Sequence, residues 1–196
     1  MIVPAAAAGI PKEVEKGRPS TIAFYAGRAW YSGLPIGKNT GKIYYSQLVE
    51  YDHNIYKCYQ EADPTAESIS DLVDTDGGVI NIPDAGAIKK MVPIARSLLV
   101  FATNGVWEIT GLDGSFKATE FSVNRVGFQG VQSADAVVVA ESEVFFVGND
   151  GLYNLTKEDF NVTFVIQDLS STTIQSLLNS ISPYGKDFAL GVYDNE

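Results

Sequence analysis

The hydrophobic pattern of this chain repeats at an interval of 46 residues. Ser97–Thr110 and Glu143–Thr156 each start with one polar and four bulky apolar residues, pass through Asn-Gly or Asp-Gly, and continue as apolar, aromatic, polar, apolar and Thr. β-branched and aromatic residues favour strands, and Asn-Gly and Asp-Gly adopt the positive φ angles of tight hairpin turns. The pattern therefore predicts two equivalent β-hairpins.

Weaker copies of the same pattern lie on both sides of this pair, within residues 27–46 and 187–193. The equivalent first residues of the four copies are Arg28, Ser97, Glu143 and Asp187. A sheet-forming repeat with a period in the forties is typical of β-propeller blades. We expect a mainly β fold with one or two short helices, in which antiparallel sheets form a β-propeller-like array. Three or four blades make a partial propeller, because closed rings usually have about 4–8.

Two apolar runs indicate strands deep in this array. Residues 137–139 and 144–147 are continuously apolar, which predicts inner strands covered on both faces. The segment Phe188–Tyr193 predicts a final strand whose hairpin partner is missing. We therefore expect the chain to be a fragment of a longer polypeptide.

Two short segments have the signals of helices. Asp63-Pro64 provides an N-cap and a first-turn proline, and a later segment ends at Pro183 after a cap at Ser170 or Ser171. The apolar residues of the later segment recur at helical spacing; they are Ile174, Leu177, Leu178 and Ile181.

Composition divides the chain into an arm, a body and an insert. Residues 1–19 lack a sustained period and are rich in Pro and Ala, which predicts an extended arm or linker. Residues 20–196 form the partial propeller domain, interrupted by an acidic insert at 52–78. The candidate channel or interface residues of this insert are Glu61, Asp63, Glu67, Asp71, Asp74 and Asp76. Because unpaired carboxylates are costly to bury, we expect them to face a channel or a neighbouring subunit instead of the core.

The charge balance restricts the possible partners. The chain has 24 acidic and 14 basic residues and a net charge of −10. Binding to nucleic acid depends on Lys and Arg that neutralise phosphates, so the sequence argues against a typical DNA-binding protein. An acidic wall would instead let DNA pass without adhering to it. The sequence has no secretory signal pattern and no apolar run near the ~20 residues that span a bilayer, which favours a soluble protein.

Several patterns resemble ligand sites but fail in detail. Residues 33–40 resemble a phosphate-binding loop, yet the glycine spacing is one residue short and the segment joins two strands. Asp74-Thr75-Asp76-Gly77 resembles the start of a calcium loop without its later ligands. Neither pattern predicts a cofactor or a metal.

Catalytic signals are equally incomplete. His53 is the single histidine and lies beside Asp52, but no nucleophile motif accompanies it. Cys58 follows Lys57, and a buried small residue is the favoured interpretation over a reactive thiol. No pair of carboxylates stands out as the acid and base of a glycosidase. We expect no catalytic residues and a protein that is not an enzyme.

The order and spacing of the motifs resemble the tail nozzle or tail hub proteins of short-tailed bacteriophages, also called packaged-DNA stabilisation or tail tubular proteins. The likeness covers about residues 21–193. The matching segments are Phe24–Ser32, Ile43–Gln47, Met91–Phe101, Gly105–Gly111 and Gly127–Gly130.

This resemblance implies a virion protein that is assembled in the cytoplasm of the bacterial host. It implies a sixfold homo-oligomeric ring below the portal and adaptor proteins, which prolongs the channel for genome ejection while double-stranded DNA passes without specific binding. No membrane contact is implied. The alternative function is a β-propeller scaffold that binds proteins or glycans through its loops.

Overall fold

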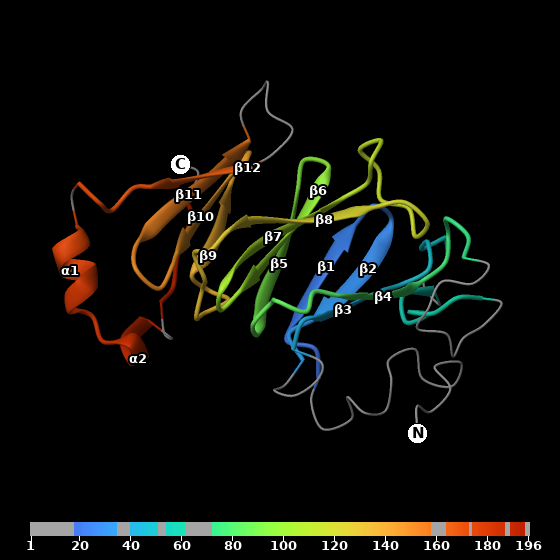
Figure 1. The fold of residues 1–196 in the computed structure, drawn as a ribbon, viewed down its shortest axis with the longest axis horizontal. Helices are drawn as coiled ribbons and strands as arrows, with labels where there is room; N and C mark the ends of the chain where they lie inside the picture. Colours follow the sequence, from blue (N-terminus) through green and yellow to red (C-terminus); the bar gives the residue numbers. More distant parts are fainter. Residues whose placement is uncertain are drawn as a thin grey trace.

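The computed structural model describes residues 18–34, 40–50, 54–61, 72–157, 164–172, 174–186 and 189–194. Within them, three four-stranded antiparallel sheets follow one another along the chain, each with its strands in sequence order (Figure 1). Sheet 1 contains β1 (Thr21–Tyr25), β2 (Arg28–Ser32), β3 (Lys42–Tyr45) and β4 (Gly78–Asn81). Sheet 2 contains β5 (Ile88–Ile94), β6 (Ser97–Ala102), β7 (Gly105–Thr110) and β8 (Ser122–Gly127). Sheet 3 contains β9 (Val137–Ala140), β10 (Glu143–Val147), β11 (Leu152–Lys157) and β12 (Phe164–Asp168). The prediction of a mainly β chain built of antiparallel sheets is confirmed.

The two strongest sequence repeats are hairpins at equivalent places in their sheets. In sheet 2, Val100 of β6 pairs with Trp107 of β7. In sheet 3, Phe146 of β10 pairs with Tyr153 of β11, each 46 residues later. The weaker copy in sheet 1 pairs Tyr31 with the aromatic residue Tyr44. The repeat in the sequence is thus a repeat of strand register.

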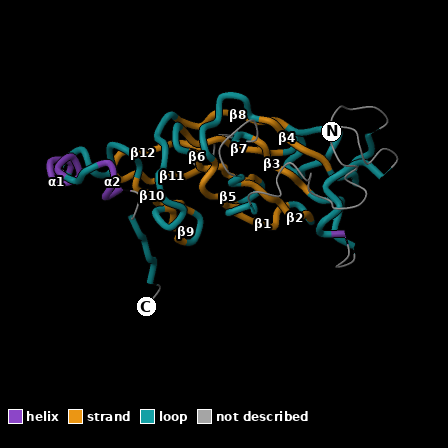
Figure 2. The backbone as a smooth tube through the Cα atoms, turned by 90° about the horizontal axis from the view of Figure 1, so that it is seen from below, coloured by secondary structure: helices purple, strands orange, loops and turns teal. Residues whose placement is uncertain are grey.

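Consecutive sheets stack face to face, with sheet 2 in the middle (Figures 1 and 2). Sheet 1 and sheet 2 share a core that includes Trp30, Tyr45 and Trp107, while Phe116, from the segment after β7, packs its edge against Trp30. The opposite face of sheet 2 packs on sheet 3; their shared core consists of Val92, Ile94, Leu99, Phe101, Val106, Val131, Val137, Val144, Phe146, Tyr153, Leu155 and Phe164. Both faces of sheet 2 are therefore covered, and each flanking sheet buries one face against it.

The first turn of every sheet has a residue other than glycine at positive φ. Ala26, Ala95 and Glu141 have φ angles of 49°, 49° and 55°, and each lies two residues before the start of its sequence repeat. Two-residue hairpin turns favour such angles, because a turn with positive φ has a backbone twist that matches the twist of the flanking strands. The recurrence of the same turn supports the equivalence of the three sheets.

Some expected elements are placed differently. Strand β9 is an edge strand and Val139 is 42% exposed, so the prediction that 137–139 is covered on both faces is wrong. Strand β10 alternates between buried and half-buried residues, so 144–147 is also fully covered on one face only. For β10 the reason is that sheet 3 has a packing partner, sheet 2, on a single side; Val139 pairs with the core residue Val144 and is exposed because β9 is the edge of the sheet.

The C-terminal elements also differ from expectation. Helix α1 (Gln175–Ser180) is capped by Ile174 without a side-chain hydrogen bond, and none of its residues is buried. A second short helix, α2 (Pro183–Lys186), follows, and both lie beyond sheet 3 (Figure 2). Residues 189–194 are not a strand, because the segment joins no sheet and the backbone bond from Gly191 to Asp135 is an isolated contact. The expected arm over residues 1–17 and the expected helix start at Asp63 lie outside the described residues.

Candidate interaction surfaces

The end of the acidic insert is held on sheet 1 by a buried arginine. Arg28 is 1% exposed and donates to the backbone carbonyls of Ser46, at 2.7 Å, and Asp76, at 2.6 Å, and also to those of Asp74 and Thr75. Its guanidinium lies 5.6 Å from the ring centroids of both Tyr45 and Phe116. Burial lowers the pKa of Arg28, and the neighbouring Tyr45, Asp76 and Asp74 offset part of that effect. The arginine thereby ties the insert to the core.

Asp76 has a structural role instead of a surface role. Its side chain accepts from the backbone N–H groups of Glu61, at 3.1 Å, and Val73, at 3.0 Å, and the residue is 3% exposed. The expectation that Asp76 faces a channel or a neighbouring subunit is therefore wrong for this residue. The physical reason is that two backbone donors compensate the buried carboxylate.

The other carboxylates of the insert are divided between surface and undescribed positions. Glu61 and Asp74 are exposed, and Asp74 accepts a hydrogen bond from the hydroxyl of Thr119. Asp63, Glu67 and Asp71 lie outside the described residues. Of the six predicted residues, Glu61 and Asp74 are therefore at the surface, and Asp76 is buried and stabilises the fold.

The segment that resembles a calcium loop already has a cation beside it. The carbonyl oxygens of Asp74, Thr75 and Asp76 accept hydrogen bonds from the Arg28 guanidinium. The positive charge beside these oxygens is therefore that of an arginine. Among the residues that the structure describes, no group of three or more His, Cys, Asp or Glu side chains is placed to hold a metal ion.

The remaining chemical candidates have structural explanations where they are described. The segment 33–40 lies in the chain between strands β2 and β3, as predicted, and its residues 35–39 lie outside the described residues. Cys58 is buried, and burial raises the pKa of its thiol to about 12, so the favoured interpretation of a buried small residue is confirmed. His53 and Asp52 lie outside the described residues.

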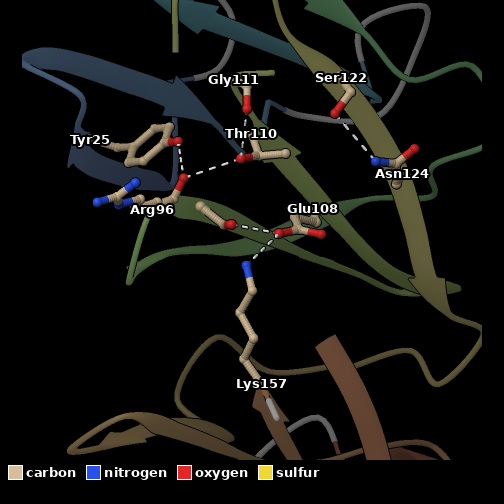
Figure 3. Close-up of polar contacts among 9 residues, drawn as sticks. Tyr25, Arg96, Glu108, Thr110, Gly111, Ser122, Asn124 and Lys157 are labelled. Carbon is tan, nitrogen blue, oxygen red and sulfur yellow. Dashed lines mark hydrogen bonds and ion pairs between the residues drawn. The ribbon is translucent and has the colours of Figure 1, made fainter. Parts of the chain in front are cut away.

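A cluster of polar contacts links the three sheets at one end (Figure 3). The Tyr25 hydroxyl of sheet 1 donates to the carbonyl of Arg96, between β5 and β6, at 2.5 Å. In sheet 2, the Ser97 hydroxyl donates to Glu108 Oε1 at 2.5 Å, and Lys157 Nζ of sheet 3 lies 3.8 Å from the same oxygen. Glu108 is 2% exposed, so this is a compensated charge inside the contact between sheets 2 and 3. Nothing in the sequence pattern singled out this carboxylate as an inter-sheet contact.

The outer face of sheet 3, on the side away from sheet 2, is apolar and open. It contains a groove of about 350 Å³, which the following residues line: Ala136, Val138, Ala140, Phe145, Phe146, Val147, Leu152, Gly191, Val192 and Tyr193. The C-terminal segment lies along one side of this groove, where Gly191 packs against Val138 and Val192 and Tyr193 also line it, while Val192 is 83% exposed. Among the described side chains of helices α1 and α2, none lines the groove, and Gln175 and Lys186 contact the turn between β10 and β11.

The outer face of sheet 1 is open along its first strand. Ile22 and Phe24 of β1 point outward and are 57% and 67% exposed. Further across the sheet, Cys58 packs on Tyr44, and the Tyr31 hydroxyl donates to the Ile55 carbonyl at 2.7 Å. The segment around Cys58 thus covers the far strands of this face and leaves β1 bare.

Comparison with known proteins identifies no family for the chain. No model of a protein family matches it, and no curated protein matches it. Within the described residues, no helix has the length and apolar character to cross a membrane.

Proposed function

We propose that this chain is a structural component of a phage tail nozzle or hub and forms part of the channel for genome ejection, attached below the portal and adaptor. The observation that carries the proposal is the series of three four-stranded antiparallel sheets that share one register and stack face to face in sequence order. Such a series is the arrangement of consecutive β-propeller blades. A propeller-like body of this kind is what the motif resemblance implies.

The charge distribution supports the same role. The net charge of −10 and the exposed carboxylates of Glu61 and Asp74 disfavour adhesion to phosphate groups. A channel for DNA needs walls that repel the polymer weakly along its length. In this role the protein positions and guides DNA without chemical catalysis.

The proposal is tested by ejection kinetics from virions that contain a neutralised insert. We expect the combined substitutions Asp63→Asn, Glu67→Gln, Asp71→Asn and Asp74→Asn to slow genome release, because DNA would adhere more strongly to the channel wall. Release is measured by the fluorescence of a DNA-binding dye after a trigger, and immunolabelling of the virions establishes where the chain lies.

A matched control neutralises four exposed carboxylates on other segments: Asp84, Glu120, Asp135 and Glu141. This control should leave the rate of release unchanged. Equal rates for wild type and the insert variant would reject the channel role of the insert. Absence of the chain from tails would reject the tail assignment itself.

A further inference from the structure

We propose that copies of this chain associate head to tail, with the outer face of sheet 3 of one copy packed on the outer face of sheet 1 of a second copy. The contact would continue, between molecules, the stacking that the chain already makes twice within itself. It follows from the two sheet faces alone and does not rest on the proposed role in a phage tail.

In the sequence repeat, the outer face of sheet 3 is equivalent to the face of sheet 2 that packs on sheet 3. The apolar residues of sheet 2 that face sheet 3 are Val92, Ile94, Leu99, Phe101 and Val106, and all are buried. The residues 46 positions later are Val138, Ala140, Phe145, Val147 and Leu152, and all of them line the open groove. Sheet 3 therefore lines an open groove with the same apolar positions that sheet 2 buries against its neighbour; Val138, Phe145, Val147 and Leu152 are half-buried there and Ala140 is buried. A repeated sheet of this kind cannot cover such a face alone and needs the next sheet in the series.

The polar contact of that interface has an equivalent as well. The pair Ser97 and Glu108 of sheet 2 is completed by Lys157 of the neighbouring sheet. In sheet 3 the equivalent pair is Glu143 and Asn154, in which Asn154 Nδ2 donates to Glu143 Oε2 at 3.1 Å. Asn154 is 7% exposed, and its Oδ1 has no hydrogen-bond partner. Because a buried polar atom without a partner is costly, a donor from a neighbouring sheet would stabilise this face.

The outer face of sheet 1 is the matching half. In the two internal interfaces, Met91 of β5 and Val137 of β9 belong to the face that receives the preceding sheet, and both are at most 4% exposed. The hairpin registers make Ile22 of β1 their equivalent, since Ile22 pairs with Tyr31 as Met91 pairs with Val100. Ile22 and Phe24 are more than half exposed. The strand that the internal interfaces bury is thus the strand that the segment around Cys58 leaves bare.

The two free faces differ, so the contact is heterologous. A head-to-tail contact generates a closed ring if the rotation between copies closes, and an open chain if it does not. Each copy has one outer face of sheet 3, which packs on a second copy, and one outer face of sheet 1, which receives a second copy. Two variants that each lose a different face can therefore still form one intact contact with each other.

The experiment measures the molar mass of the full chain by light scattering and sedimentation over a range of concentrations. We expect the wild type to associate and the single variants Phe145→Asp and Phe24→Asp to be monomers, with Phe128→Asp as the control. Phe128 is 76% exposed and lies on neither face, so this control should associate as the wild type does. Circular dichroism and thermal unfolding check that each variant keeps its fold.

The decisive measurement mixes the two monomeric variants. A head-to-tail contact predicts that equal amounts of Phe145→Asp and Phe24→Asp form a dimer, because sheet 3 of the second variant and sheet 1 of the first are both intact. A monomeric wild type would overturn the proposal. Association that survives Phe24→Asp but not Phe145→Asp would also overturn it, because it would indicate a contact between two copies of sheet 3.

Discussion

At the scale of single residues, buried polar side chains position the segments that the hydrophobic pattern leaves undefined. Arg28, Ser97 and Glu143 occupy the same position of the sequence repeat, yet each makes a different contact. Arg28 bonds to loop carbonyls, Ser97 to Glu108, and Glu143 to Asn154. The apolar positions of the repeat are equivalent, whereas this polar position is specialised in each sheet. Such contacts depend on which loops meet in space, so the repeat itself could not predict them.

Arg28 should be important for stability. We expect Arg28→Met to lower the free energy of unfolding by about 3 kcal/mol or more, because hydrogen bonds to charged groups contribute about 1.5–3 kcal/mol each and several carbonyls would lose their donor. Urea unfolding measures the loss. The exposed Arg96 supplies the control, since Arg96→Met should change stability by less than about 0.5 kcal/mol. Equal losses for the two variants would contradict the anchoring role of Arg28.

Because the thiol of Cys58 is buried, we expect the free energy of unfolding to fall in alkaline solution. Burial raises the pKa of its thiol from 9.0 to about 12. Above pH 9 the thiol ionises in the unfolded chain but stays protonated in the folded chain, so the free energy of unfolding should fall as pH rises from about 9 towards 12. The slope from one such group is at most about 1.4 kcal/mol per pH unit.

The variant Cys58→Ala isolates this effect. Its free energy of unfolding should fall less steeply than that of the wild type between pH 9 and 10, where the contribution of Tyr45, whose pKa burial raises from 10.0 to about 12, is still small. Chemical denaturation at closely spaced pH values gives both slopes. Identical slopes would mean that the thiol is not buried in solution.

At the scale of elements, periodicity alone did not predict which faces are buried. The apolar residues of the C-terminal segment do fall at helical spacing, and helix α1 forms there. However, Leu177 is 62% exposed, and no residue of α1 is buried. The pattern identified the helix correctly but could not show whether another element lies against its apolar side.

Two leucines provide a test of this difference. We expect Leu177→Ala to change the free energy of unfolding by less than about 0.5 kcal/mol, as is usual for exposed sites. Leu99→Ala should cost about 2–5 kcal/mol, because Leu99 is fully buried between sheets 2 and 3. Thermal and urea unfolding compare the two variants directly. A comparable loss for Leu177→Ala would show that α1 packs on the body in solution.

The turns at the start of each sheet were also missed at this scale. Asn104-Gly105 and Asp150-Gly151 do mark the two hairpins, but the expectation that they adopt positive φ is wrong: the described residues with positive φ are Ala26, Gly27, Gly33, Ala95, Gly114 and Glu141. Ala26, Ala95 and Glu141 adopt positive φ without such a signal. There the pairing of the flanking strands, rather than the intrinsic preference of the residue, determines the backbone conformation.

At the scale of the whole molecule, the middle sheet is the centre of the fold. Sheet 2 is covered on both faces, and its strand β6 is buried along its whole length. Sheets 1 and 3 each bury one face; the outer face of sheet 1 carries the exposed Ile22 and Phe24, and that of sheet 3 lines the open groove with half-buried apolar residues. This asymmetry explains both the internal stability of the stack and its proposed association with a second copy.

The proposed channel role also belongs to this scale, since it concerns the location of charge on an assembly. The insert is anchored through Arg28 and Asp76, and its exposed carboxylates Glu61 and Asp74 lie next to that anchor. The anchor holds the charges of Glu61 and Asp74 at a fixed place beside sheet 1. Ejection kinetics decide whether that place borders DNA.

The amino-acid sequence by itself determined the mainly β character and the two equivalent hairpins 46 residues apart, because these follow from local alternation, although the strand expected at Phe188–Tyr193 did not form over residues 189–193. Tertiary structure alone decided which apolar strands are covered, that Asp76 is buried and compensated, and that Glu108 meets Lys157 between sheets. The reason is that burial and compensation depend on neighbours distant in the chain, and a repeat pattern specifies the shape of each sheet but not what lies against it.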